Sequence, residues 1–132
     1  MNSFTIEMQL PGLNEYTQAN RTHAQAGGRF KKQTEADIML FICLAKRRGE
    51  LRPVDYPVTL KIEWQEATRK RDPDNIVSAK KFILDALVSG GILPNDTQRY
   101  IKGFTERIIK SDAARVKVTL IPADDQQETA RK

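Results

Sequence analysis

Four aspartates and two neighbouring lysines gather in the middle of the chain. They are Asp72, Asp74, Asp85 and Asp96, with Lys80 and Lys81. Mg²⁺ prefers oxygen ligands, and it needs only two or three carboxylates because it keeps several of its waters. A cation held in this way can polarise a phosphate and lower the pKa of an attacking water. These residue types therefore predict the chemistry of a metal-dependent nuclease.

Basic residues surround this acidic stretch and favour an anionic partner. The chain has a net charge of +5 and a pI near 9.5. Arginine and lysine position phosphates without reading the base sequence. We expect two groups of basic side chains to contact DNA, one directly before the acidic stretch and one earlier in the chain. They are Arg69, Lys70 and Arg71, and Arg21, Arg29, Lys31 and Lys32.

The rest of the composition leaves few other routes to catalysis. His23 is the only histidine and Cys43 the only cysteine, which argues against a histidine triad and excludes an internal disulfide. We expect His23 to be exposed in a polar loop, with a phosphate contact as the alternative, and Cys43 to lie in the core. No apolar run is long enough to span a bilayer, and no signal-peptide pattern opens the chain, so we expect a cytoplasmic protein.

These groups must be positioned by strands and helices. The pattern of these elements along the sequence predicts one α/β domain over residues 1–122 and a polar tail over 123–132. Alternating apolar residues predict four strands, over 3–10, 58–65, 100–110 and 115–121. Helical spacing and end signals predict helices over 29–48 and 73–89, with a long polar loop over 14–28. The order β-α-β-α-β-β predicts a mixed sheet of about four strands, with its two main helices on one face and one right-handed crossover.

Spacing within the second helix decides which residues share a face. Asp74, Ser78, Lys81 and Asp85 follow one another in steps of four, three and four, so they form one stripe. Lys80 falls toward the apolar side, and the periodicity therefore favours Lys81 as the working lysine. The alternative is an ordinary solvated face carrying a Lys81–Asp85 ion pair.

Three aspartates favour a site over a plain surface. Asp72 and Asp74 stand one residue apart at a strand-to-helix junction, where Asp72 also fits the helix N-cap. Asp96 follows a glycine-rich turn that could fold it back beside them. Close carboxylates repel one another, and a divalent cation converts that repulsion into coordination. A lysine beside such a cation could stabilise charge in the transition state.

The same residues resemble the RusA family of Holliday-junction resolvases, small endodeoxyribonucleases often encoded by phages and prophages. The family pattern is Asp-x-Asp-Asn, a lysine four residues before Asp-Ala-Leu, and an acidic pair after a glycine turn. Here the pattern is matched by Asp72-Pro73-Asp74-Asn75, by Lys81 with Asp85-Ala86-Leu87, and by Asn95-Asp96 after Gly91. A looser resemblance extends from Phe4 to Ile121.

The resemblance implies a homodimer that nicks four-way junctions or other branched DNA symmetrically during recombination and repair, using Mg²⁺ or Mn²⁺. By matching position, it implies that Asp72, Asp74 and Asp96 are catalytic and bind the metal. It implies Lys81 as the catalytic lysine. The residues expected in supporting roles are Asp85, Asn95, Lys80 and Asn75.

The chain departs from the family pattern at two places. The interval from Asp74 to Asp85 is longer by about one helical turn, which keeps the helix face but leaves the choice between Lys80 and Lys81 open. Asn95 stands where an aspartate is common. Its amide can still offer a carbonyl ligand or a hydrogen bond, but with less charge.

Two other functions fit parts of the pattern. In a non-catalytic branched-DNA-binding protein, the basic residues would carry the affinity and the aspartates would be caps and surface charges. Binding would then be sensitive to salt and would leave no nicked product. A nucleotide- or sugar-phosphate-handling enzyme would need a closed pocket, and the pair Gly27-Gly28 is too short to predict a phosphate-cradling loop.

Overall fold

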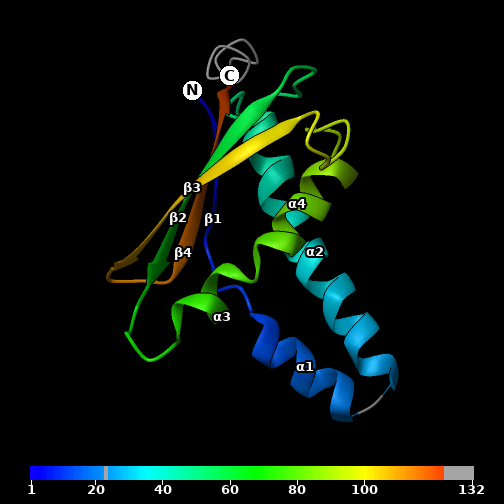
Figure 1. Ribbon diagram of the computed structural model, residues 1–132, viewed down its shortest axis with the longest axis vertical. Helices are drawn as coiled ribbons and strands as arrows, with labels where there is room; N and C mark the ends of the chain where they lie inside the picture. The colour runs from blue at the N-terminus through cyan, green and yellow to red at the C-terminus, as the bar shows by residue number, and fades with distance from the viewer. Residues whose placement is uncertain (23, 124–132) are drawn as a thin grey trace, which may run out of the picture.

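The structure is a computed structural model that describes residues 1–22 and 24–123. Its strands are β1 (Asn2–Ile6), β2 (Val58–Glu66), β3 (Ile101–Lys110) and β4 (Arg115–Pro122). Its helices are α1 (Leu13–Thr22), α2 (Ala24–Arg47), α3 (Pro73–Val77) and α4 (Lys80–Ser89) (Figure 1). The expectations for His23 and for the tail over 124–132 lie outside the described residues.

The strands form one mixed sheet in the order β1-β4-β2-β3, which confirms the predicted α/β fold. The pairs β1–β4 and β4–β2 are antiparallel, whereas β2 and β3 are parallel. Parallel neighbours need a crossover connection, and α3 and α4 provide it. The acidic stretch is therefore carried by the connection between two adjacent strands.

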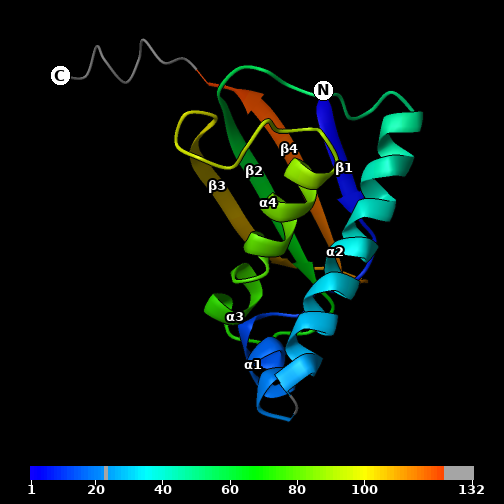
Figure 2. The same cartoon turned by 90° about the vertical axis from the view of Figure 1, so that its right-hand side faces the viewer.

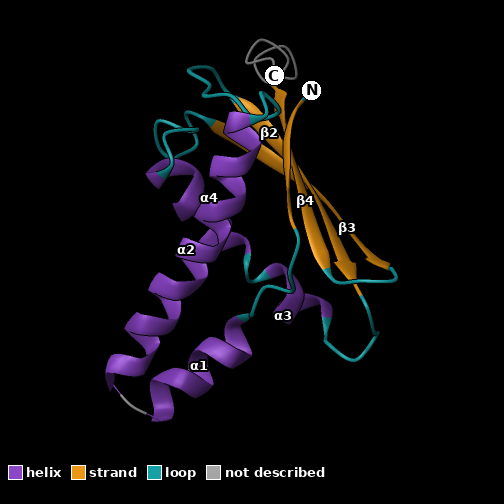
Figure 3. Ribbon diagram, turned by 180° about the vertical axis from the view of Figure 1, so that it is seen from behind, coloured by secondary structure: helices purple, strands orange, loops and turns teal. Residues whose placement is uncertain are grey.

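The helices cover one face of the sheet, as predicted, and leave the other face bare (Figures 2 and 3). Side chains in β2 alternate between buried and more exposed positions, so one side of the strand faces the helices. The core lies between these layers, and its largest fully buried side chains include Trp64, Ile38, Ile83 and Leu87.

The predicted polar loop over 14–28 is wrong, because α1 and the start of α2 occupy it. The first backbone amides of α1 are capped from far along the chain. Leu13 N–H donates to Ser78 Oγ at 2.7 Å, and Asn14 N–H donates to Asn75 Oδ1 at 2.9 Å. Tyr16 also packs its ring against Phe30 and Phe82. These tertiary contacts, which local sequence does not reveal, stabilise a helix of polar residues.

The predicted continuous helix over 73–89 is divided into α3 and α4 at Ser78 and Ala79. Ser78 Oγ donates to the carbonyl of Asn75 at 2.6 Å, and Ala79 N–H turns to the carbonyl of Ile76 at 3.4 Å. A side-chain hydroxyl has thus replaced a backbone donor in the helical ladder. The break separates Asp72 and Asp74 from the helix that carries Lys81.

Two smaller expectations are also corrected. The first strand ends at Ile6 and not at residue 10. Ile6 pairs with Val116 of β4, and because β4 begins at Arg115, it offers almost no backbone for later residues to pair with. Cys43 is exposed and not in the core, since the buried positions of α2 include Ile38, Ile42 and Ala45, on the other side of the helix. No helix in the described part of the chain is long and apolar enough to cross a membrane.

Candidate active site

The first part of the site is the turn over residues 71–75, named here the aspartate turn. Asp72 occupies the N-cap position of α3, as predicted, and its backbone carbonyl accepts hydrogen bonds from the N–H groups of Asn75 and Ile76, both at 3.1 Å. Within the described residues, its carboxylate makes no capping hydrogen bond. Among the described residues, Asp74 Oδ1 accepts only the adjacent N–H of Asn75, at 3.0 Å. Both aspartates are exposed, so their oxygens remain available to a ligand.

The residues that flank the two aspartates are largely or fully buried, and both make hydrogen bonds. The Arg71 side chain is only 13% exposed and points its guanidinium at Glu66, with Nη1 3.4 Å from both carboxylate oxygens. Arg71 Nη2 also donates to the carbonyl of Leu10 at 3.1 Å. Asn75 is buried, and its side-chain amide bonds to α1 on both sides, to Asn14 and Glu15. The turn therefore presents free carboxylates on a fixed base.

The second part of the site is the lysine cluster, which consists of Lys31, Lys81, Asp85 and Asp96. Lys81 Nζ lies 3.0 Å from Asp85 Oδ1 and 3.5 Å from Asp96 Oδ2. Lys31, from α2, lies 3.8 Å from the other oxygen of Asp85. The hydrogen bond and charge of Asp85 raise the pKa of Lys81, and Asp96 adds to the effect. These contacts reinforce the ammonium form that a lysine has at neutral pH.

Lys80 points away from this cluster. Its Nζ lies 2.8 Å from Glu106 Oε2 and 4.2 Å from the centre of the Phe104 ring, both on β3. The same glutamate accepts a hydrogen bond from Trp64 Nε1 at 3.0 Å. Lys80 therefore connects α4 to the sheet, while Lys81 contacts two of the predicted site aspartates.

Asp96 does not join Asp72 and Asp74 in one group. Among the described residues, no three histidine, cysteine, aspartate or glutamate side chains gather closely enough to hold a metal together. Asn95 turns its Oδ1 to the backbone N–H of Thr97 at 3.1 Å, so it shapes the turn after α4. The two free carboxylates of the aspartate turn still suit a cation that keeps most of its waters.

The predicted DNA-contacting residues fall on two separate segments. Arg69 and Lys70 are exposed in the loop between β2 and α3. The others are exposed on α1 and the first half of α2, which lie together beyond the end of the sheet (Figure 3). They are Arg21, Arg29, Lys31 and Lys32. Arg71 differs from both sets, since its guanidinium is turned inward to Glu66.

Sequence reasoning missed the two glutamates that engage Arg71. The sequence does contain a signal for Glu66. In β2, every second residue faces the core, and Glu66 takes the last of these core-facing positions. A carboxylate on the core side of a strand needs a partner, and Arg71 follows five residues later. Glu15 carries no comparable signal, since α1 itself was not predicted.

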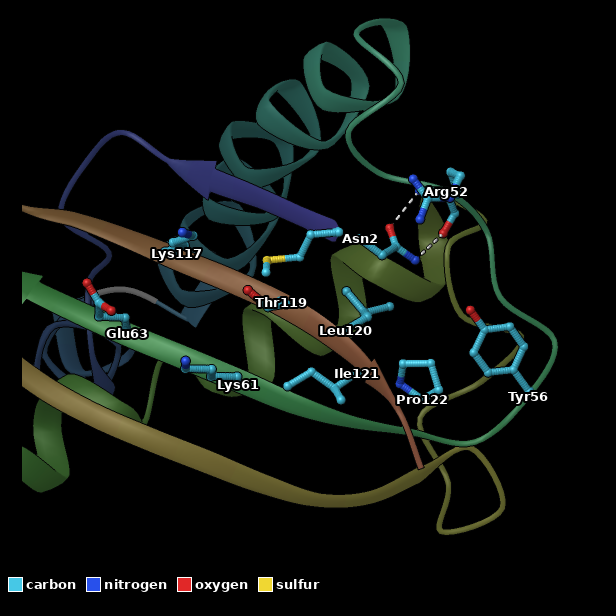
Figure 4. Close-up of a pocket in the computed structure, with 11 residues that line it drawn as sticks. Asn2, Arg52, Tyr56, Lys61, Glu63, Lys117, Thr119, Leu120, Ile121 and Pro122 are labelled. Carbon is cyan, nitrogen blue, oxygen red and sulfur yellow. Dashed lines mark hydrogen bonds between the residues drawn. The ribbon is translucent and has the colours of Figure 1, made fainter. Parts of the chain in front are cut away.

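A hollow of about 420 Å³ lies on the bare face of the sheet (Figure 4). Lys61, Glu63 and Lys117 point into it from β2 and β4, and Tyr56 lies at its rim. Its lining, taken over the described residues, includes none of the predicted site residues. The hollow is therefore separate from the aspartate turn and the lysine cluster.

Comparison with known proteins identifies the family. The family model described as endodeoxyribonuclease RusA matches residues 8–121. No curated protein matches the chain. The matched range contains both the aspartate turn and the lysine cluster, together with every element after β1 except the last residue of β4. The chain therefore belongs to the RusA family of endodeoxyribonucleases, the Holliday-junction resolvases that its motifs resemble.

Proposed function

We propose that this RusA-family endonuclease cleaves branched DNA in a reaction that depends on Mg²⁺ or Mn²⁺, and that Asp72 and Asp74 hold the cation. The observation that carries the proposal is the pair of exposed carboxylates, one residue apart, at the start of α3. Two carboxylates, retained waters and a substrate phosphate complete the coordination that Mg²⁺ prefers. When bound there, the cation supplies positive charge to the scissile phosphate and acidifies a water.

Lys81 supplies a positive charge of its own. A lysine is protonated at neutral pH, and Asp85 raises the pKa of Lys81 further, so this side chain is a poor proton acceptor. Its role in the proposal is to bind a phosphate oxygen and stabilise the negative charge that grows during cleavage. Asp85 holds it in place at 3.0 Å.

Asp96 completes the proposed set of catalytic aspartates. It contacts Lys81 at 3.5 Å in a largely exposed ion pair, and such pairs are worth no more than about 1 kcal/mol. DNA binding at the lysine cluster therefore needs little energy to release Asp96 from Lys81. Once released, the Asp96 carboxylate would be available as a further oxygen ligand for a cation at Asp72 and Asp74.

The basic residues on the two segments lead the DNA to the site. Arg69 and Lys70 lie directly before the aspartate turn, and Lys31 belongs to the lysine cluster. Phosphate contacts from both segments would hold one strand across the site without selecting its sequence. This binding should weaken steeply as salt is added.

We also propose that the active species is a homodimer. A four-way junction has two-fold symmetry, and two symmetric nicks need two active sites. A C2 dimer satisfies both requirements. The molar mass in solution, measured by light scattering with and without junction DNA, tests this point. A monomeric mass together with paired nicking would overturn it.

The decisive experiment compares a labelled four-way junction with matched linear duplex, in Mg²⁺ or in EDTA. We expect symmetric nicks in the junction only, lost in EDTA and in Asp74→Asn. Asp55→Asn, at an exposed aspartate in another loop, is the matched control and should cleave normally. Cleavage in EDTA, or by Asp74→Asn, would overturn the metal proposal. Tight binding without nicks would favour the non-catalytic branched-DNA-binding function.

A further inference from the structure

One carboxylate from α1 holds the residues on both sides of the two aspartates. Glu15 Oε2 accepts a hydrogen bond from Asn75 Nδ2 at 3.2 Å, and Glu15 Oε1 lies 3.6 Å from Arg71 Nη2. Arg71 directly precedes Asp72, and Asn75 directly follows Asp74. A single side chain, distant in sequence, therefore fixes both ends of the aspartate turn.

Glu15 is itself held by the segment that leads into α1. Its Oε2 also accepts the N–H of Gly12 at 3.3 Å. Asn75 returns a bond to the same segment, since its Oδ1 accepts the N–H of Asn14 at 2.9 Å. A Cβ on residue 12 would collide with the carbonyl oxygen and the side chain of Asn75. The two segments are thus in close contact, and the position of one determines the position of the other.

The charge of Glu15 has a specific partner. Arg71 is 13% exposed and lies between Glu66, which is 10% exposed, and Glu15, which is 40% exposed. Arg71 Nη2 also donates a hydrogen bond to the backbone carbonyl of Leu10. The buried Nε of Arg71 has no partner among the described residues. Most of its donors are used inside the protein, so Arg71 has little to offer a DNA phosphate. Its side chain instead joins the aspartate turn to β2 and α1.

We propose that Glu15 is a positioning residue for the metal-binding aspartates, acting through Arg71 and Asn75. This inference rests on the proposed function of Asp72 and Asp74. Groups that orient the ligands of a metal typically change its affinity about 10- to 100-fold when they are lost. Glu15 touches neither DNA nor cation in this role. Its contribution is to keep the two carboxylates at one spacing and one orientation before the cation arrives.

The test uses Glu15→Gln, which keeps the size of the side chain and removes its charge. We expect the Mn²⁺ concentration for half-maximal junction cleavage to rise by about 10-fold or more, with the junction Kd unchanged in the absence of metal. The same shift should appear in Mn²⁺ binding to the free protein, followed by electron paramagnetic resonance. Arg71→Lys keeps the charge and loses the planar guanidinium. It should raise the required Mn²⁺ concentration in the same way as Glu15→Gln. Glu50→Gln, at an exposed glutamate after α2, is the control.

A readout without metal separates this inference from the proposed function. Hydrogen exchange of the amides over residues 72–78 should become at least several-fold faster in Glu15→Gln and stay unchanged in Glu50→Gln. Wild-type exchange rates in Glu15→Gln would overturn the positioning role, whatever the metal data show. A lower Tm with unchanged Mn²⁺ dependence would also overturn it, because a merely structural residue would behave so. If wild-type protein binds no Mn²⁺, the proposed function fails, and the inference about the metal ligands fails with it.

Discussion

The aspartate turn and the lysine cluster both carry carboxylates of the family motif, but they are built in opposite ways. In the turn, Asp72 and Asp74 are exposed and have few partners among the described residues. Beside them, Arg71 is largely buried, Asn75 is buried, and both are bonded. In the cluster, Asp85 and Asp96 already have lysine partners, and Lys81 is 64% exposed. The turn carries unsatisfied charge on a bonded base, whereas the charges of the cluster are already paired with one another.

Of these two regions, only the aspartate turn can bind a cation without first breaking ion pairs. Two free carboxylates on a fixed base lose little on coordination, because their mutual repulsion is relieved by the cation. The carboxylates of the cluster must first give up ion pairs, although exposed pairs of this kind contribute only about 0–1 kcal/mol each. We therefore expect the turn to bind the cation first and the cluster to respond to the DNA.

Substitutions of the aspartates should distinguish the two regions most strongly. Asp72→Asn and Asp74→Asn should abolish Mn²⁺ binding and lower junction cleavage by on the order of 1,000-fold. Asp85→Asn should leave Mn²⁺ binding intact and lower cleavage by about 10-fold, because Lys81 loses the partner that orients it. Titration calorimetry with Mn²⁺, beside single-turnover cleavage, measures both quantities.

Asp96→Asn tests whether Asp96 contributes to cation binding before DNA is bound. If Asp96 joins the cation only when DNA is bound, this variant should bind Mn²⁺ like the wild type and cleave poorly. Loss of Mn²⁺ binding as complete as in Asp74→Asn would show that the turn and the cluster already meet on the cation before DNA arrives.

The next effect distinguishes two adjacent lysines. Lys81→Met should lower kcat by about 100-fold and leave the stability almost unchanged, since its ion pairs are exposed. Lys80→Met should instead lower the free energy of unfolding by about 1–2 kcal/mol, because it loses Glu106 and the Phe104 ring. Single-turnover kinetics and urea unfolding of both variants check this. A larger kinetic defect in Lys80→Met would reverse the assignment.

The strands and the acidic motif were predictable because their signals are local. Alternation along β2 needs only nearby residues, and so does the helical stripe that favoured Lys81. The helix α1 was not predictable, because its first amides are capped by Asn75 and Ser78, more than 60 residues later. The placement of Asp96 beside Lys81 depends on the path of the chain after α4, which no local pattern determines.

A smaller effect tests the close packing beneath the aspartate turn. Gly12→Ala should destabilise the protein by about 1–3 kcal/mol, because the added methyl group collides with Asn75. Gly28→Ala is the matched control within α2. Its methyl group would meet nothing within 4 Å among the described residues, so it should stabilise by about 0.5–1 kcal/mol. Urea denaturation measures both changes. Equal effects of the two substitutions would show that the turn is not tightly packed against α1.

An exposed carboxylate in another turn tests how little such contacts contribute to the stability of the protein. The proposal for the lysine cluster requires that this contribution be small. In the turn between β3 and β4, a hydrogen bond from Ser111 Oγ lowers the pKa of Asp112, and the charge of Arg115 lowers it further. A lowered pKa in the folded state stabilises the protein above the unfolded value and loses that effect as the pH falls through the folded value. Asp112→Asn should therefore lower Tm at pH 7 by less than Gly12→Ala does. The difference should shrink as the pH falls below 3.8, the ordinary aspartate value. A Tm difference independent of pH would assign the effect to the shape of the side chain and not to its charge. A difference of many degrees would show that exposed ion pairs in this protein, including those of Lys81, cost much free energy to break.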